Sequence, residues 1–388
     1  MADPKWADDR FLDELRRQTD PLADAAVADF LKTRSLGEIN YIFQTMRSDD
    51  QPILATAPES LQAFVRQTEA LPPDLDLARL DRASEVFLRH AASACMVLLA
   101  SSLPNGYAAP CLTHILMISR DLAKDPFKRL MGVLQLLVNI TSRDAFAPGG
   151  LAVVTAQKLR LLHAGVRVIV RHRRPGYEAR YGPAVNHEDM LATLMAFSHL
   201  VIDGLRKLDL GLTDEQAEDY YYLWRVYALL MGIHPPGAPL DDSFVPQTVE
   251  DAAQFYASYT RRQFTGPEEN PSGVLLTQDN VDMIVSLLPT PLRHTDLQVA
   301  PQIVMAELMG PEGMARVGVK PVEGHAALRE SLHLALCAEQ TVAGAAPCGL
   351  VESLSRHLFD KMIDSSRGGA VQFIVPGSVA DLRGAGLA

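Results

Sequence analysis

The stretch "LAVVTAQKLRLLHAGVRVIVRHR" (residues 151–173) decides the fold class, because it is long, apolar and helical in its spacing. On an α-helix its apolar side chains fall along one face, which carries Leu159, Leu162, Val166, Ile169 and Val170. The adjoining face carries Arg160, His163 and Arg167, at positions i, i+3 and i+7. An apolar face of this length packs against other parts of a protein. We therefore expect a largely buried helix that brings one histidine and two arginines into the fold.

The same helical periodicity extends over most of the chain. Asp-Pro pairs open the stretches at 20–33 and 125–141, which places a proline in the first turn of each predicted helix. Thr213 and Gln216 have the spacing of a capping box at the start of another. Further helices are predicted at 80–103, 186–208, 213–233, 249–264, 277–289, 298–309, 326–339 and 349–364. No alternation typical of a parallel sheet accompanies them, so the sequence predicts an all-α protein.

Composition limits the class of protein further. The chain has 388 residues, of which 48% are hydrophobic, so it can bury a large core. The formal net charge of −11 argues against non-specific binding to nucleic acid or to an anionic membrane. The first residues, "MADPKWADDRFLDELRRQ", are charged and do not read as a signal peptide. The apolar runs are too short to form a transmembrane segment, and we expect a cytoplasmic protein.

The role of His163 is the main question that the long helix raises. Burial and two neighbouring positive charges both favour the neutral imidazole, which is the form that a metal ion or haem iron binds. Two arginines beside it would suit a dianionic partner such as the haem propionates. The pattern also fits a histidine packed in the core, with arginines that pair with any of the 47 acidic side chains. From these residues alone, both interpretations stay open.

Other histidines carry weaker signals. His187, Glu188 and Asp189 are adjacent in "NHEDM" (186–190), so a helix would point them in different directions. That stretch is more typical of a helix start than of a metal site. His199, in "LMAFSHL" (194–200), is predicted to lie in the core or at its rim. The sequence contains no phosphate-binding loop, nucleophile elbow or zinc-protease motif.

An ordered set of stretches links the chain to a known family. The set is "DPLADAAVADFL" (20–31), "SLPNGYAAP" (102–110), "KRLMGVLQLLVNITSRDAFAPGG" (128–150), "LRLLHAGVR" (159–167), "VNHEDMLATLMAFSHLVIDGLRKL" (185–208), "WRVYALLMGI" (224–233) and "LPTPLR" (288–293). The most specific part is the Arg-x-x-His-x-x-x-Arg pattern at 160–167. In this order the stretches resemble the latex clearing protein, or rubber oxygenase, family. That family also includes the fungal endoplasmic-reticulum oxygenase that cleaves a farnesyl chain in mycophenolic acid biosynthesis.

The resemblance implies a globin-like helical bundle around one haem b, with additional helices at both ends. His163 would be the metal ligand, and Arg160, Arg167 and Arg293 would match the family's cofactor-binding arginines near it. Residues 1–80 would form an N-terminal helical arm and residues 81–310 the haem-binding helical core. Residues 311–388 would add C-terminal helices and a Gly-rich tail, with all three parts in one domain.

The sequence departs from the family pattern in the region that would face the other side of the haem. Arg129 fits the arginine that opens the distal helix, but Gly132 and Val133 stand where many members carry a polar residue and a threonine. The stretch "APCLTHILMIS" (109–119) lacks the glutamate that serves rubber-cleaving members as a base. Thr113 and His114 are the nearest polar candidates there. With Arg129 they are the predicted catalytic residues, and we expect an apolar, open distal pocket.

The functional prediction is a haem b-dependent oxygenase. Its co-substrate would be molecular oxygen, and its substrate an apolar small molecule, with isoprenoids as the family's substrate class. Oxidative cleavage of a carbon–carbon double bond is the family reaction that the resemblance implies. One alternative is a haem protein that binds oxygen or another gas, or exchanges electrons, without cleavage. A second is a helical lipid-binding protein without haem. The sequence predicts no nucleic-acid partner and does not specify an oligomeric state.

Overall fold

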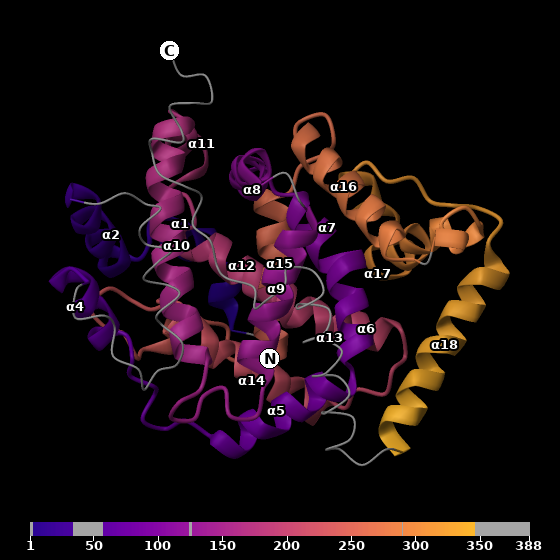
Figure 1. The fold of residues 1–388 in the computed structure, drawn as a ribbon, viewed down its shortest axis with the longest axis horizontal. Coiled ribbons are helices and arrows are strands. Elements are labelled where there is room, and N and C mark those ends of the chain that lie inside the picture. The colour runs from indigo at the N-terminus through magenta and orange to yellow at the C-terminus, as the bar shows by residue number, and fades with distance from the viewer. Residues whose placement is uncertain (1–2, 34–56, 124–125, 289, 346–388) are drawn as a thin grey trace.

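The structure, a computed structural model, is all-helical in the residues that it describes, which are 3–33, 57–123, 126–288 and 290–345 (Figure 1). The prediction of an all-α fold is confirmed. The α-helices are α1 (Asp9–Arg17), α2 (Pro21–Thr33), α4 (Glu59–Gln67), α5 (Leu77–Arg89), α6 (Ala91–Val97), α7 (Leu103–Tyr107), α8 (Pro110–Ala123), α9 (Pro126–Thr141), α10 (Ala152–Arg173), α11 (Tyr177–Tyr181), α12 (His187–Phe197), α13 (His199–Lys207), α14 (Asp214–Leu230), α15 (Val249–Gln263), α16 (Pro271–Leu287), α17 (Ala300–Arg316) and α18 (Ala326–Ala345). Short helical turns are η1 (Pro4–Ala7), η2 (Leu98–Ser102), η3 (Asp242–Phe244), η4 (Thr290–Leu292) and η5 (Asp296–Val299). The helix predicted at 349–364 lies outside the described residues.

Local sequence signals account for the ends of several helices. Helix α10 spans almost the whole stretch predicted to be helical. At the start of α14, the Thr213 hydroxyl accepts from the Gln216 backbone N–H, and the Gln216 side chain accepts from the Thr213 N–H. The predicted capping box is therefore present. Asn186 caps α12 in a similar way, by accepting from the backbone N–H of Asp189.

Two stretches predicted as continuous helices are interrupted. The helix expected at 80–103 begins earlier, as α5, and the chain bends by 78° between α5 and the continuous helical stretch Ala91–Tyr107 that follows. That stretch includes the π-helical turn η2, where the Asn280 side chain donates to the Leu99 carbonyl at 2.8 Å. The helix expected at 186–208 breaks at Ser198, whose φ and ψ of −111° and −82° separate α12 from α13. The helical spacing of apolar residues continues past both positions, so the sequence pattern does not reveal either break.

The helices bury two apolar clusters. The larger cluster contains α5 packed along α14 and reaches from Trp6 to Val317. The smaller one lies between α2, α4 and α10, where Phe30, Phe64 and Leu161 are fully buried. In Figure 1, α2 and α4 lie at one edge of the molecule beside α10, and α18 lies at the opposite edge. Helix α10 thus has the small cluster on one side and the main body of the protein on the other.

The described part of the predicted N-terminal arm is packed into the fold. Trp6, Leu12 and Leu15 are completely buried in the larger cluster. Arg262 of α15 donates to the carboxylate of Asp13 at 2.5 Å, which ties α1 to a helix far along the chain. The Gly-rich tail predicted within 311–388 falls mostly beyond residue 345 and lies outside the described residues.

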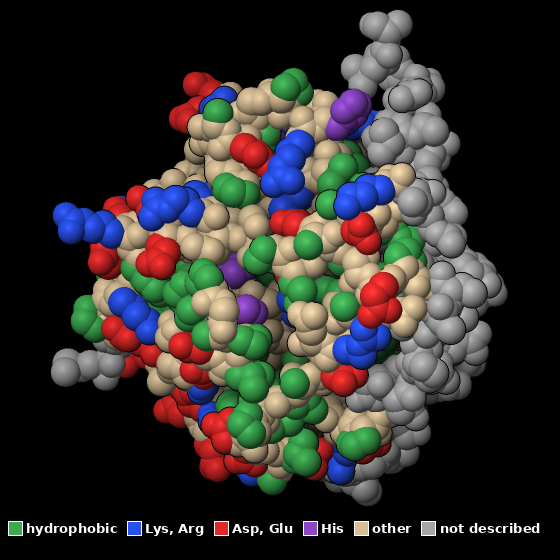
Figure 2. Space-filling model, turned by 90° about the vertical axis from the view of Figure 1, so that its left-hand side faces the viewer, with side chains coloured by type: hydrophobic (Ala, Val, Ile, Leu, Met, Phe, Trp, Pro, Cys, Tyr) green, Lys and Arg blue, Asp and Glu red, His purple; other side chains and the backbone are tan. Residues whose placement is uncertain are grey.

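The charge distribution on the surface and the lengths of the helices relate to the predictions about nucleic acid and membranes. Acidic and basic side chains intermix over the face in Figure 2, with hydrophobic side chains between them. No single helix of the described ranges is long and apolar enough to cross a membrane. The helical stretches Leu77–Arg89 and Ala91–Tyr107 reach that length and composition only as a pair, and the 78° bend lies between them.

Candidate functional site

A large cavity of about 1100 Å³ lies within the helical core. Its volume slightly exceeds the upper end of the range for small-molecule sites, roughly 300–1,000 Å³. Residues from the helical stretch 91–107, from α8, α9, α10 and α12, and from α14 to α18 line it. Most of them are aliphatic or aromatic, and Asp189 is the one Asp, Glu, Lys or Arg among the described lining residues. Such a cavity suits an apolar ligand, and it is large enough for one bigger than a typical metabolite.

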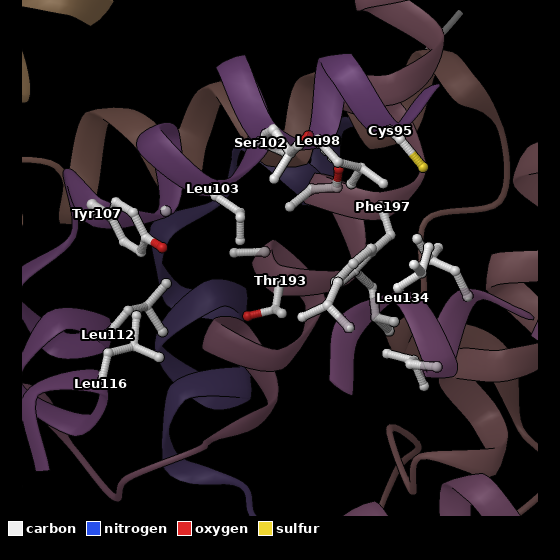
Figure 3. Close-up of a pocket in the computed structure, with 18 of the residues that line it drawn as sticks. Cys95, Leu98, Ser102, Leu103, Tyr107, Leu112, Leu116, Leu134, Thr193 and Phe197 are labelled. Atoms are coloured by element: carbon white, nitrogen blue, oxygen red, sulfur yellow. Dashed lines mark hydrogen bonds between the residues drawn. The ribbon is translucent and has the colours of Figure 1, made fainter. Parts of the chain in front are cut away.

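The close-up in Figure 3 shows the apolar character of this cavity. Leucines from neighbouring helices, among them Leu103, Leu112 and Leu134, converge on it, and the Phe197 ring forms part of the boundary. Thr193 projects into the central space. Its side chain is exposed although α12 is otherwise largely buried, and its hydroxyl donates to the Asp189 carbonyl at 2.9 Å. Thr193 therefore places a polar group in contact with the open space.

Helix α10 presents the predicted apolar face to the cavity. The lining residues from this helix are Leu159, Leu162, His163, Val166, Ile169 and Val170. At about 100° per residue, His163 lies at one edge of that face, roughly 60° around the helix from Arg160. The periodicity of the sequence thus predicts correctly which side of α10 is apolar, and His163 is its polar member.

His163 has the properties required of a ligand to a metal centre. Burial and, to a smaller extent, the charge of Arg167 lower the pKa of His163 from 6.5 to about 4, although Asp20 opposes the shift. The imidazole is therefore neutral at pH 7. Its Nδ1 atom is buried without a hydrogen-bond partner, while part of the side chain remains accessible. Because the residue lines the cavity, the accessible part of this neutral ring can meet a bound group.

The two arginines of α10 pair with acidic side chains of the protein. Arg160 donates from Nε to Oδ2 of Asp20 at 2.6 Å and from Nη2 to Oδ1 at 3.0 Å. Arg167 donates from Nε to Oδ1 of Asp24 at 2.7 Å. Neither arginine lines the cavity. Of the two possibilities that the sequence leaves open for these charges, the structure shows pairing with acidic side chains.

Arg293, the third predicted cofactor-binding arginine, follows directly after η4. It is half-buried, and its Nε donates to the Leu288 carbonyl at 2.7 Å. Leu288 and the nearby Leu297 both line the cavity, whereas Arg293 does not. The structure thus places Arg293 behind a short stretch of the lining and does not bring it together with Arg160 and Arg167.

Helix α8 turns two predicted catalytic residues away from the cavity. Its lining residues are Leu112, Ile115, Leu116 and Ile118. Thr113 is fully buried and donates to Oδ1 of Asn270 at 2.9 Å. His114 lies against Tyr181, with 3.3 Å between Nε2 and the phenol oxygen, and burial lowers its pKa. The structure gives neither residue a place at the cavity, because both lie on the other faces of this helix.

Helix α9 contributes only apolar residues to the lining in its described part. These are Met131, Val133, Leu134, Leu136 and Leu137. Arg129 belongs to the helix, but its side chain lies outside the described residues. Gly132 is not a lining residue, and a Cβ atom there would meet no other atom within 4 Å. Val133 is thus the member of the predicted Gly132–Val133 pair that reaches the cavity.

A buried polar network around Asp189 was not predicted from the sequence. Oδ1 of Asp189 accepts from Arg16 at 2.7 Å and from the Tyr259 hydroxyl at 2.9 Å, and Oδ2 accepts from Asn186 at 2.8 Å. The neighbouring Glu188 accepts from both Arg16 and Arg262. The adjacent acids of "NHEDM" give a signal for a helix start only, because Arg16 is 173 residues away from Asp189. No group of three or more potential His, Cys, Asp or Glu metal ligands occurs in the described parts of the chain.

Comparisons with known proteins agree with this architecture. A rubber oxygenase from Streptomyces sp. (strain K30) is 23% identical over 273 residues, which cover 69% of this chain and 64% of that protein. The chain thus spans just under two thirds of that relative's length. A solved structure of latex clearing protein LCP in the closed state has a TM-score of 0.73 at 19% identity and covers 89% of this chain and 91% of its own, so it supports the fold. The family described as ER-bound oxygenase mpaB/B′/rubber oxygenase, catalytic domain, matches residues 85–338. Because this match takes in well over half of the chain, including α10 and the cavity-lining helices, the protein belongs to that family.

Proposed function

We propose that the protein is a haem b-dependent oxygenase that acts on an apolar small molecule, with isoprenoids as the first substrates to test. The observation that carries the proposal is His163, a neutral imidazole at the edge of a large apolar cavity. Membership of an oxygenase family supports it. Haem iron needs only one such side chain as an axial ligand, so a cluster of metal ligands is not required.

The residues present fit a bound haem in three respects. The cavity has the volume for a large planar group, its lining is apolar, and the His163 ring is neutral with an unpartnered Nδ1. His163 would hold the iron. The arginines of α10 support the ligand helix through Asp20 and Asp24, rather than by contact with the cavity. When bound, haem supplies the activation of molecular oxygen.

The chain itself supplies binding, orientation and exclusion of water. Leucines from α8, α9 and α10 offer apolar surface, at about 25 cal/mol for each Å² of apolar area removed from water. Thr193 places a hydroxyl in the central space, where it can hydrogen-bond a polar atom of a bound molecule. The cleavage of a double bond would leave carbonyl groups. The Thr193 hydroxyl proton is donated to the Asp189 carbonyl, so this side chain can accept a hydrogen bond from a bound molecule as it stands, and it could donate to a product carbonyl only after turning away from Asp189. Arg129 stays a candidate for the distal side.

Absorption spectroscopy provides the first test. Freshly purified protein should show a Soret band that shifts on reduction with dithionite and again on addition of carbon monoxide. His163→Ala should lose most of the haem or change the spectrum strongly. His199→Ala is the matched control, because His199 is a largely buried histidine of α13 that does not line the cavity. A native spectrum and full haem content in His163→Ala would show that the assignment is wrong.

Two alternative functions can be distinguished from the proposed one by experiment. A haem protein that binds gas without cleavage is favoured by the absence of any carboxylate among the α8 residues that line the cavity. It would show the haem spectrum but release no carbonyl product from an isoprenoid under oxygen. A haem-free lipid carrier is favoured by the apolar lining alone. It would be colourless, would not take up haem and would bind a fluorescent fatty acid.

A further inference from the structure

The two arginines that flank His163 are buried and carry charges that must be compensated. Arg167 is completely buried, and Arg160 is 6% exposed. An unpaired charge at such positions is strongly destabilising, because the protein interior replaces water poorly as a solvent for ions. Helix α2 supplies both partners: Asp20 at its start and Asp24 one turn later. The two acids are four residues apart and the two arginines seven residues apart, and each arginine reaches one of the acids.

The geometry of these pairs fixes the rotation of α10 about its own axis. The Arg160–Asp20 contact is bidentate, which sets the direction of the side chain as well as its distance. Nη1 of Arg160 also donates to the Leu230 carbonyl at 3.3 Å. The guanidinium packs against Gly232, where an added Cβ atom would lie 3.0 Å from Cζ of Arg160. Arg160 is thus held from α2 and from the end of α14 at once.

His163 lies between the two pairs along the helix, three residues after Arg160 and four residues before Arg167. A rotation of α10 that broke the pairs would also move the imidazole away from the edge of the cavity. The carboxylates have a second effect, because they cancel two positive charges close to the ring. A positive charge near a redox centre favours its reduced state, so an uncompensated arginine would raise the reduction potential of a haem held by His163.

We propose that Asp20, just before α2, and Asp24, within it, are positioning residues for His163, acting through Arg160 and Arg167, and that they lower the reduction potential of the bound haem. The proposal rests on the proposed function, since it requires a haem on His163. It assigns the N-terminal helices a part in the site although they do not line the cavity. The two ion pairs link residues 140 and 143 positions apart in the chain.

The test compares Asp20→Asn and Asp24→Asn with Asp219→Asn in the full-length haem protein. Asp219 is a matched control because it is also a buried carboxylate, 4% exposed, that pairs with two arginines, Arg79 and Arg82. It joins α14 to α5 and does not line the cavity. Midpoint potential is measured by spectroelectrochemistry, haem loss by transfer to a haem-scavenging apoprotein, and stability by thermal unfolding.

We expect Asp20→Asn and Asp24→Asn to raise the midpoint potential and to speed haem loss by roughly 10–100-fold, the usual range for residues that orient a metal ligand. Asp219→Asn should lower the melting temperature while leaving the potential and the haem loss rate unchanged. Asp20→Glu should keep the potential near wild type. If Asp20→Asn fails to fold, the double variant Asp20→Leu/Arg160→Met removes both charges and should restore a wild-type potential. If the midpoint potential is unchanged in Asp24→Asn, or if it shifts equally in Asp219→Asn, this inference is wrong but the proposed function is not affected. If the wild-type protein takes up no haem, both the proposed function and this inference are wrong.

Discussion

Removal of one hydroxyl from α14 should stabilise the haem-free protein. Tyr227 lines the cavity and is 1% exposed, and its hydroxyl is buried without a hydrogen-bond partner. A buried polar group without a partner costs about 1–3 kcal/mol of stability, because it has lost its bonds to water. Tyr227→Phe removes that group and keeps the ring, so the free energy of unfolding should rise by about 1 kcal/mol or more. Tyr220 supplies the matched control on the same helix, since its hydroxyl donates to the Phe197 carbonyl at 2.8 Å.

Urea denaturation of both variants measures these changes in the free energy of unfolding. Tyr220→Phe should lower the free energy of unfolding by about 1 kcal/mol, because it removes a satisfied hydrogen bond and leaves a buried carbonyl. Tyr227→Phe should move the midpoint in the opposite direction, with the slope m unchanged in both variants. A loss of stability in Tyr227→Phe as large as that in Tyr220→Phe would show that the hydroxyl is paired and would refute the reasoning. Repeating the measurement with haem bound asks whether a bound group supplies the missing acceptor, in which case the gain shrinks.

Three further predictions concern stability and its dependence on pH. Burial and the nearby His234 lower the pKa of His187 from 6.5 to about 4, so its contribution to stability is complete above about pH 6.5 and is lost as the pH falls towards 4. The loss amounts to at most about 3 kcal/mol. In acid titrations followed by circular dichroism, the stability of haem-free His187→Phe should therefore fall less steeply between pH 6.5 and 4 than that of the wild type. Gly132→Ala should raise stability by about 0.5–1 kcal/mol in denaturant melts, because a Cβ atom meets open space there and alanine favours the helix. Leu161→Ala, in the fully buried contact of α10 with α2, should cost about 2–5 kcal/mol by the same assay, and a cost below 1 kcal/mol would contradict the packing described.

Local signals in the sequence predicted the elements well, because helix formation depends on neighbours a few residues apart. The extent of α10, its apolar face and the Thr213 capping box all follow from spacing within one element. The breaks at His90 and Ser198 do not, because the helical spacing of apolar residues continues past both positions. The choice of Thr113 and His114 as catalytic candidates shows the same limit. Both are the nearest polar residues in the stretch that lacks the family's glutamate. The face of α8 that meets the cavity, however, is decided by helices far along the chain.

The arginines of α10 show why a pattern can indicate a ligand helix without indicating its partners. A buried ion pair adds little stability over well-packed apolar residues of the same volume, so Arg160 and Arg167 are not explained by stability. Apolar contacts between α2 and α10, such as Phe30 with the surrounding cluster, already join the two helices. Apolar contacts are non-directional, however, and tolerate small rotations of a helix. Directional bonds to Asp20 and Asp24 do not tolerate such rotations. A small rotation would move a ligand such as His163 away from the edge of the apolar face. Where a single imidazole must meet a bound group, directional ion pairs on either side of it along the helix therefore offset their desolvation cost by fixing its position.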